Sequence, residues 1–189
     1  MRAALCLALV LAACSGGEEA MRHVARGKAL LAEQKYDAAA AELSKATALD
    51  KNSMEAWLNL GHAYYGLKQH DTALAAYVAA KKIDRHSTAP HVAHAKVQVE
   101  LGRIEQATTE LNFVVEMDPK NLEALILLGQ VSQMPHKLAN GSTGVTRASL
   151  ERAELNLDAA TRLDPQNPVA RAELEKVRGI LSNFKESKQ

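Results

Sequence analysis

Residues 57–77 read WLNLGHAYYGLKQHDTALAAY, and this stretch decides the fold. Its pattern is Trp57-x2-Leu60-Gly61-x2-Tyr64, followed by Ala73-x3-Tyr77. Similar residue types return at one constant interval along the chain: Asp50, Asp84 and Asp118; Ala39, Ala73 and Ala107; Leu43, Tyr77 and Leu111. A fixed period of about 34 residues indicates that the chain is built from copies of one supersecondary unit.

This pattern resembles the tetratricopeptide repeat (TPR), whose unit is a helix–turn–helix of about 34 residues. The resemblance covers residues 20–184 and implies an all-α fold, a TPR α-solenoid of about four helix–turn–helix repeats followed by a C-terminal capping helix. We expect the repeats at residues 20–53, 54–87, 88–121 and 122–167, the capping helix at 168–184 and a tail at 185–189.

The fourth repeat is longer than the others, because Asp118 and Asp164 lie further apart than the earlier recurrent aspartates. Pro135, Asn140-Gly141 and Gly144 are turn signals that place the insertion in a loop near residues 134–146. After it, the spacing of the apolar residues from Leu150 to Ala160 predicts that a helix resumes.

Two recurrent positions have a direct physical interpretation. One position holds Gly27, Gly61, Ala95 and Gly129, and we expect the two helices of a repeat to cross closely there. Their expected small partners on the second helix are Ala39, Ala73, Ala107 and Ala153. The recurrent aspartates follow the repeat period, so we expect loop and cap residues there and no acidic site.

The segment 1–19 differs from the repeats. An apolar run behind Arg2 ends at Cys14, which is too short for the roughly 20 apolar residues of a membrane-spanning helix. Leu11-Ala12-Ala13-Cys14 resembles the lipobox of bacterial lipoproteins. That resemblance implies a signal peptide over 1–13, acyl chains such as palmitate on Cys14, and a tether over 14–19. The alternative is a buried N-terminal helix with two ordinary cysteines, Cys6 and Cys14.

The lipoprotein resemblance also implies a location. Ser15 stands where that family often has an aspartate for inner-membrane retention, so an outer-membrane address facing the periplasm is implied.

The charge balance argues against nucleic acid as the main partner, since 23 Lys and Arg balance 22 Asp and Glu. No Ser/His/Asp arrangement with elbow-type glycines and no phosphate-binding glycine loop is present, so we expect neither an enzyme nor a cofactor.

The TPR resemblance implies a concave groove lined mainly by the first helix of each repeat. Carried over by repeat position, the fifth positions are Val24, Leu58, Val92 and Ile126. The ninth positions are Lys28, His62, Lys96 and Gln130, and the twelfth are Leu31, Tyr65, Val99 and Gln133. An apolar ladder beside a polar, partly basic stripe favours an amphipathic helix, or an extended peptide with apolar and acidic groups, as the partner. The alternative is that neighbouring repeats or the capping helix cover these residues.

One subclass of TPR proteins holds the carboxylates of chaperone tails with a clamp of lysines, asparagines and an arginine. Asn59 matches one clamp asparagine. Val24 stands where a clamp lysine belongs, and Lys28 stands where an asparagine belongs. The sequence therefore disfavours a chaperone tail as the partner.

Two classes of function stay open. The first is a lipid-anchored scaffold or adaptor in the bacterial envelope that assembles or localises a secretion, pilus or cell-wall complex, similar to pilotin-like repeat lipoproteins. The second is a metal- or small-ligand-binding lipoprotein that uses His86, His91 and His94. No cysteine or well-placed third ligand completes that set, so we expect packing or half-exposed histidines.

Overall fold

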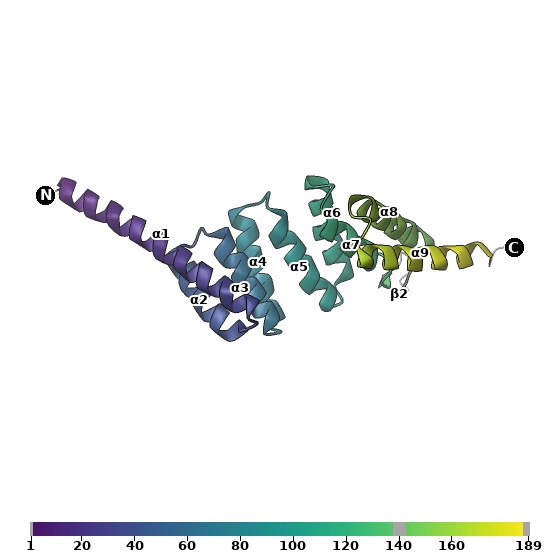
Figure 1. Ribbon diagram of the computed structural model, residues 1–189, viewed down its shortest axis with the longest axis horizontal. Helices are drawn as coiled ribbons and strands as arrows, with labels where there is room; N and C mark the ends of the chain where they lie inside the picture. The colour runs from purple at the N-terminus through teal and green to yellow at the C-terminus, as the bar shows by residue number, and fades with distance from the viewer. Residues whose placement is uncertain (1, 138–142, 187–189) are drawn as a thin grey trace. The chain divides into compact units, whose positions relative to one another are not determined.

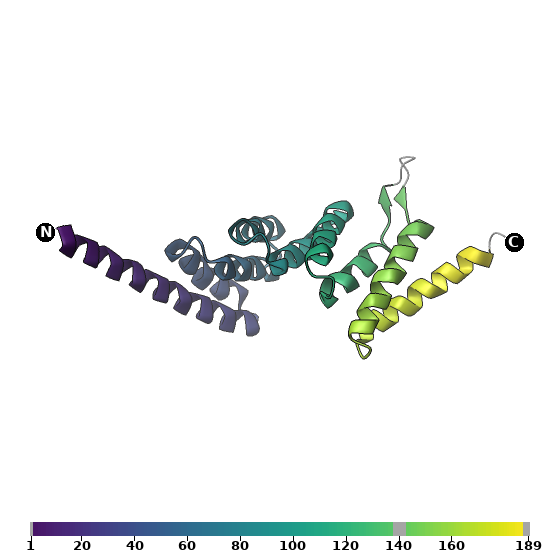
Figure 2. The same ribbon diagram turned by 90° about the horizontal axis from the view of Figure 1, so that it is seen from above.

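The computed structural model describes residues 2–137 and 143–186, which form nine α-helices and one two-stranded hairpin (Figure 1, Figure 2). The predicted all-α fold class is confirmed. The chain divides into two compact units, residues 1–93 and 94–189. The predicted repeat domain over 20–184 extends through both units. Such a division is expected of a repeat protein, because each repeat packs only on its neighbours.

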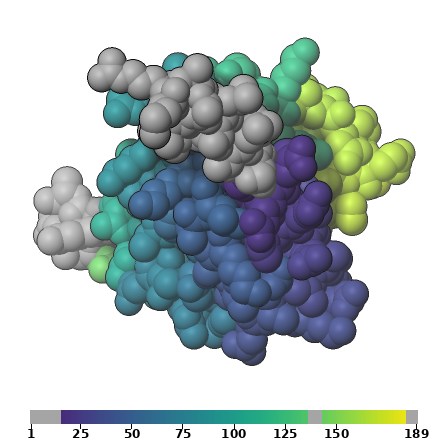
Figure 3. Space-filling model, turned by 90° about the vertical axis from the view of Figure 1, so that its left-hand side faces the viewer, coloured from purple at the N-terminus to yellow at the C-terminus, as the bar shows by residue number. Residues whose placement is uncertain are grey.

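Unit 1 contains the first two helix pairs. α1 (Arg2–Ala32) packs on α2 (Tyr36–Leu49), and α3 (Met54–Gly66) packs on α4 (His70–Ile83). α3 also contacts both α1 and α2, so the pairs share a core. Figure 3 shows the described part of α1, in purple, against the blue surface of its neighbours. α5 (Thr88–Glu100) contains the boundary between the units.

α1 runs through the N-terminal segment. The residues expected to form a tether, 14–19, lie within this helix, and the expected lipidation of Cys14 stays a prediction. An ion pair between Glu18 and Arg22, four residues apart at 3.7 Å, is typical of a helical surface. The side chains of Cys6 and Cys14 lie outside the described residues. Within the described chain, no helix has the length and apolar character needed to cross a membrane.

The structure also corrects the expected partners of the first-helix glycines. A Cβ atom added at Gly61 would lie within 3.0 Å of the Tyr77 ring. Gly27 and Gly129 face Leu43 and Leu157 in the same way. These partners follow the predicted alanines by four residues on the second helix. Each glycine therefore makes room for a bulky side chain. The predicted partners Ala39, Ala73, Ala107 and Ala153 are themselves fully buried.

The recurrent aspartates are cap and loop residues, as predicted. Asp50, Asp84, Asp118 and Asp164 are the C-caps of α2, α4, α6 and α8. Each carboxylate accepts a hydrogen bond from the backbone N–H two residues later, at 2.9–3.1 Å. These bonds satisfy backbone donors in the loop to the following helix, which explains why the aspartate returns with every repeat.

Unit 2 contains α6 (Ile104–Met117), α7 (Leu122–Val131), α8 (Arg147–Leu163) and α9 (Pro168–Glu186). The insertion in the fourth repeat is more regular than the expected loop. β1 (His136–Lys137) and β2 (Thr143–Gly144) pair antiparallel, with His136 opposite Gly144. The predicted turn at Asn140-Gly141 lies outside the described residues, as do residues 187–189 of the predicted tail.

α9 packs on α8 and supplies the last layer of unit 2. Its buried face of Leu174, Val177 and Leu181 meets Leu150 and Leu157 of α8. Beside this face, Arg178 pairs with Glu154 of α8 at 2.8 Å and with Asp158 of α8 at 3.2 Å, and Glu175 and Lys176 are exposed. A helix with one apolar and one charged face is what the end of a repeat stack requires.

Candidate functional site

A cavity of about 230 Å³ lies between the first helices of the first two repeats. Met21, Val24 and Lys28 of α1 line it together with Glu55 of α3. Val24 and Lys28 are predicted groove residues, and the structure brings them to one cavity. Met21 is 65% exposed and Val24 is 7% exposed, so the methionine lies at the opening and the valine lies deeper. We call this region the α1–α3 face.

The fifth repeat positions do not all form an open apolar ladder. Val24 and Val92 are buried, at 7% and 4% exposure, and only Leu58 of unit 1 is half-buried at this position. In unit 2, Ile126 packs on a cluster that includes Leu125 and Ala170 of α9. The expected alternative, that neighbouring elements cover the groove, therefore applies to part of it.

The twelfth positions are also partly used in packing. Leu31 packs against the cluster of Leu43 and Leu60, and Val99 is half-buried. The ring of Tyr65 meets His70 edge-on at 6.2 Å between centroids, and Lys68 Nζ lies 5.4 Å from its centre. These side chains therefore offer only part of their surface to a partner.

The two lysines at ninth positions form the same ion pair in both units. Lys28 Nζ lies 2.7 Å from Glu55 Oε1, and Lys96 pairs with Glu123. The sequence predicts a partly basic stripe, but each positive charge has a carboxylate beside it. Such exposed pairs stabilise a protein by only about 0.2–1 kcal/mol, so their main effect is on the local charge. Glu55 and Glu123 were missed as site residues, although both stand at the same offset from their lysine in the sequence.

The other ninth positions contain His62 and Gln130, whose side chains contact other residues of the chain. His62 Nδ1 lies 3.0 Å from the hydroxyl of Tyr77, and the two rings meet edge-on. Burial raises the pKa of Tyr77, so this hydroxyl stays protonated. The contact directs His62 toward the second helix of its repeat.

α9 occupies the end of the predicted groove in unit 2. Gln133 Nε2 donates hydrogen bonds to Glu173 of α9 at 2.9 Å and to the carbonyl oxygen of Gly129 at 3.1 Å. Burial alone would raise the pKa of Glu173, but hydrogen bonds from Gln133, Lys176 and Gln130 leave it below its ordinary value. Gln130 and Gln133 therefore bind the chain's own last helix.

The histidines do not gather into a metal site. His94 Nδ1 lies 3.3 Å from Glu110, whereas His86 is exposed and His91 is half-buried. Among the side chains that the structure describes, no group of three or more His, Cys, Asp or Glu is placed to hold a metal ion. The alternative of a metal- or ligand-binding protein through these histidines thus gains no support.

Together with Lys45, one histidine, His23, helps to lower the pKa of a carboxylate, that of Glu42. His23 Nδ1 lies 2.8 Å from Glu42, and Lys45 donates to the same carboxylate at 2.7 Å. The hydrogen bond from Lys45 and then that from His23 lower the pKa of Glu42 to about 2. The pair joins α1 to α2 and is structural in character.

The remaining clamp-like residue is engaged within its own helix. The Asn59 amide donates to the carbonyl oxygen of Glu55 at 2.8 Å. Lys28, which stands where a clamp asparagine would be, is paired with the Glu55 carboxylate. Of the described residues at clamp positions, neither Asn59 nor Lys28 is free to hold a peptide carboxylate.

Comparison with known proteins agrees with this architecture. A family model of the TPR repeat matches residues 27–68, and one of the tetratricopeptide repeat matches residues 55–87. Superkiller complex protein 3 of Mus musculus is 27% identical over 133 residues. That match covers 70% of this chain but only 8% of the length of that protein.

Two solved structures show the fold directly. The first TPR of Spaghetti (RPAP3) bound to the HSP90 peptide SRMEEVD is 25% identical, with a TM-score of 0.60, and the match covers 62% of this chain and 93% of that chain. PilF of Pseudomonas aeruginosa is 18% identical, with a TM-score of 0.74, and the match covers 91% of this chain and 72% of that chain. The chain thus contains tetratricopeptide repeats and has the all-α TPR fold, which serves in general as a protein-interaction module.

Proposed function

We propose that this chain, a protein of the all-α TPR fold, is an adaptor that binds a segment of a partner protein at the α1–α3 face. The cavity of about 230 Å³ carries this proposal, because predicted groove residues line it and Met21 is exposed at its opening. An exposed apolar side chain beside a cavity is a surface that a partner's side chain can cover with a gain of free energy.

The chemistry of the cavity defines the partner segment. Met21 and Val24 suit one apolar anchor, and methionine adapts its shape readily to different anchors. Lys28 and Glu55 offer a donor and an acceptor side by side, with no net charge. We therefore expect a helical or extended segment with one apolar anchor, flanked by polar groups and without strong net charge. Peptide binding by the TPR of RPAP3 supports a peptide as the kind of ligand. Because Val24 and Lys28 do not match the carboxylate clamp, we do not expect the HSP90 peptide itself as the ligand.

We propose further that acyl chains on Cys14 anchor this adaptor in a bacterial envelope, at the outer membrane and facing the periplasm. The support is the lipobox resemblance of Leu11-Ala12-Ala13-Cys14. Met21 follows Cys14 by about two helical turns, which is roughly 10 Å along a helix axis. The α1–α3 face would then bind its partner close to the lipid surface, as assembly or localisation of a secretion, pilus or cell-wall complex requires.

Charge substitutions test the binding site. Met21→Glu places a charge at the cavity and should abolish recovery of the partner in a pull-down from the source cell's envelope. Leu155→Glu is the matched control, because Leu155 is 70% exposed on α8 and does not line this cavity. Circular dichroism should show equal helicity for both variants. Equal recovery of the same partner by both variants would refute the proposed site.

A further inference from the structure

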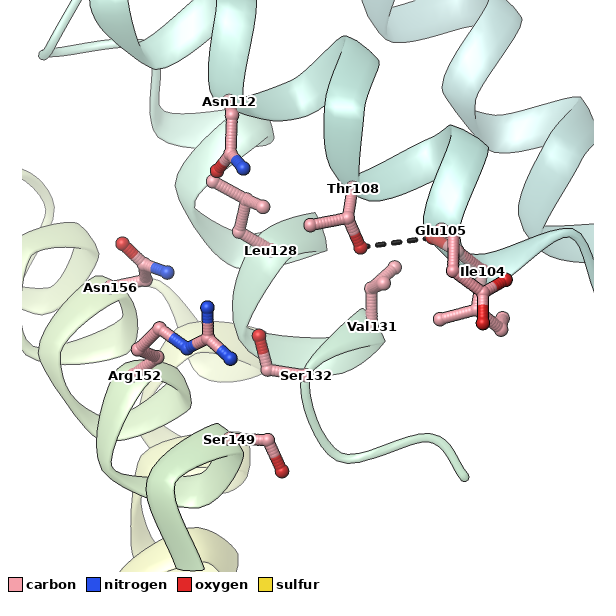
Figure 4. Close-up of a pocket in the computed structure, with 10 residues that line it drawn as sticks. All are labelled: Ile104, Glu105, Thr108, Asn112, Leu128, Val131, Ser132, Ser149, Arg152 and Asn156. Atoms are coloured by element: carbon pink, nitrogen blue, oxygen red, sulfur yellow. Dashed lines mark hydrogen bonds between the residues drawn. The ribbon is translucent and has the colours of Figure 1, made fainter. Parts of the chain in front are cut away.

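A second cavity, of about 250 Å³, lies within unit 2 between α6, α7 and α8 (Figure 4). Leu128 and Val131 of α7 and Ile104 of α6 give it apolar walls. The predicted groove residues of α7, Ile126 and Gln130, do not line it. This cavity is therefore separate from the α1–α3 face, and a ligand bound in it would be independent of the proposed function.

The fourth repeat leaves this corner open for two reasons. α7 ends at Val131 and has 10 residues, whereas α3 and α5 have 13 each, because the chain turns toward Pro135 and the insertion. The third repeat also bridges the equivalent corner with a His94–Glu110 pair at 3.3 Å and an Arg103–Gln98 contact at 3.5 Å.

The fourth repeat has different residues at those positions. Leu128 and Asn156 replace the histidine and the glutamate, and Ser132 and Ser149 replace the glutamine and the arginine. These shorter or apolar side chains do not bridge the corner in the part of the chain that the structure describes. The space that the third repeat fills is left as a cavity.

The cavity has a distinct polar end. In Figure 4, Arg152 points from α8 toward Ser132, and Asn156 lies one turn further along α8. Within the described residues, the side chains of Arg152, Asn156 and Ser132 have no hydrogen-bond or ion-pair partner. Glu105 lies at the far end, beside Ile104 (Figure 4). A guanidinium next to an amide and a hydroxyl is complementary to a carboxylate.

We propose that this cavity binds the carboxyl-terminal residue of a partner chain whose last side chain is aliphatic. The carboxylate would accept hydrogen bonds from Arg152 and Asn156, and the side chain would pack on Leu128 and Val131. The partner chain would leave the cavity at the end where Glu105 lies. The volume is just below the roughly 300 Å³ at which pockets for larger ligands begin, so it suits one residue rather than a long segment.

An NMR titration of the ¹⁵N-labelled full chain tests the site with two leucine probes and, for comparison, N-acetyl-glutamate amide. N-acetyl-leucine should shift the amide resonances of Leu128, Val131 and Asn156. N-acetyl-leucinamide lacks the carboxylate and should bind about tenfold more weakly, as expected for the loss of a charged hydrogen bond. Arg152→Gln should weaken N-acetyl-leucine by about the same factor. The matched control Arg171→Gln, an exposed arginine on α9, should leave the affinity unchanged.

Several results would overturn the proposal. Equal affinity for the acid and the amide would show an apolar pocket without carboxylate recognition. Equal affinity of the Arg152→Gln and wild-type chains for N-acetyl-leucine would exclude Arg152 as the cation that binds the carboxylate. Tighter binding of N-acetyl-glutamate amide would point to an internal acidic side chain rather than a chain end. An absence of shifts at Leu128 and Val131 with either probe would mean that the cavity does not bind this ligand class.

Discussion

Gly61→Ala tests the packing principle of the repeat, because it adds a single methyl group where two helices meet. The new Cβ atom would lie within 3.0 Å of three atoms of the Tyr77 ring, a separation that real Cβ atoms essentially never show. The ring cannot easily move away, since Tyr77 is 1% exposed and its hydroxyl is bonded to His62. Overpacking of this kind costs about 1–3 kcal/mol. Alanine recovers about 1 kcal/mol through its higher helix propensity.

The net expectation is a loss of about 0–2 kcal/mol in the free energy of unfolding, or a Tm lower by up to roughly 8 °C. Gly179→Ala is the matched control, because Gly179 lies in α9 with no atom within 4 Å of an added Cβ. That variant should gain about 0.5–1 kcal/mol. Urea unfolding followed by circular dichroism measures both variants. If Gly61→Ala gained as much stability as Gly179→Ala, the close contact with Tyr77 would not be what requires glycine at this position.

Three other features of the chain lead to predictions of their own. The turn residue Gln34 has a positive φ of 58°, and the equivalent residue of the third repeat is Gly102 at 69°. Gln34→Gly should therefore raise the free energy of unfolding by up to about 1 kcal/mol, and Gly102→Ala should lower it by about 1 kcal/mol, in the same urea assay. Because the pKa of Glu42 is lowered to about 2, its contribution to stability is present above about pH 4.5 and is lost as the pH falls toward 2. Glu42→Gln should flatten that part of the pH profile of the free energy of unfolding, and an unchanged profile would contradict the assignment. Radiolabelled palmitate should enter the wild-type chain and not a Cys14→Ala variant, and equal labelling of both would exclude Cys14 as the lipid site.

Features that recur with the repeat period were predictable from sequence. The aspartate caps follow from spacing alone, because a short polar side chain serves the same loop in each repeat. Close helix contact at Gly61 was also predictable, but its partner was not. The residue that faces a glycine depends on the direction of side chains along the second helix, and Tyr77 points there in place of Ala73.

Features that depend on contacts between elements were not predictable in the same way. The prediction of a partly basic stripe was wrong in its net charge. Carboxylates of the following repeat pair with Lys28 and Lys96. Val92 is likewise buried, which its repeat position alone did not indicate. The cavity beside Arg152 arises where α7 ends, and a helix end that depends on an insertion has no periodic signal.

Site-specific photo-crosslinking at the α1–α3 face tests the central claim most directly. A photoreactive amino acid at position 21 should join the chain to one protein partner in living cells, and the crosslinked peptide of that partner should contain an apolar residue at the attachment point. The same amino acid at position 155 should give no such product. Equal crosslinking of that partner from both positions, or a partner captured only from position 155, would contradict binding at the α1–α3 face.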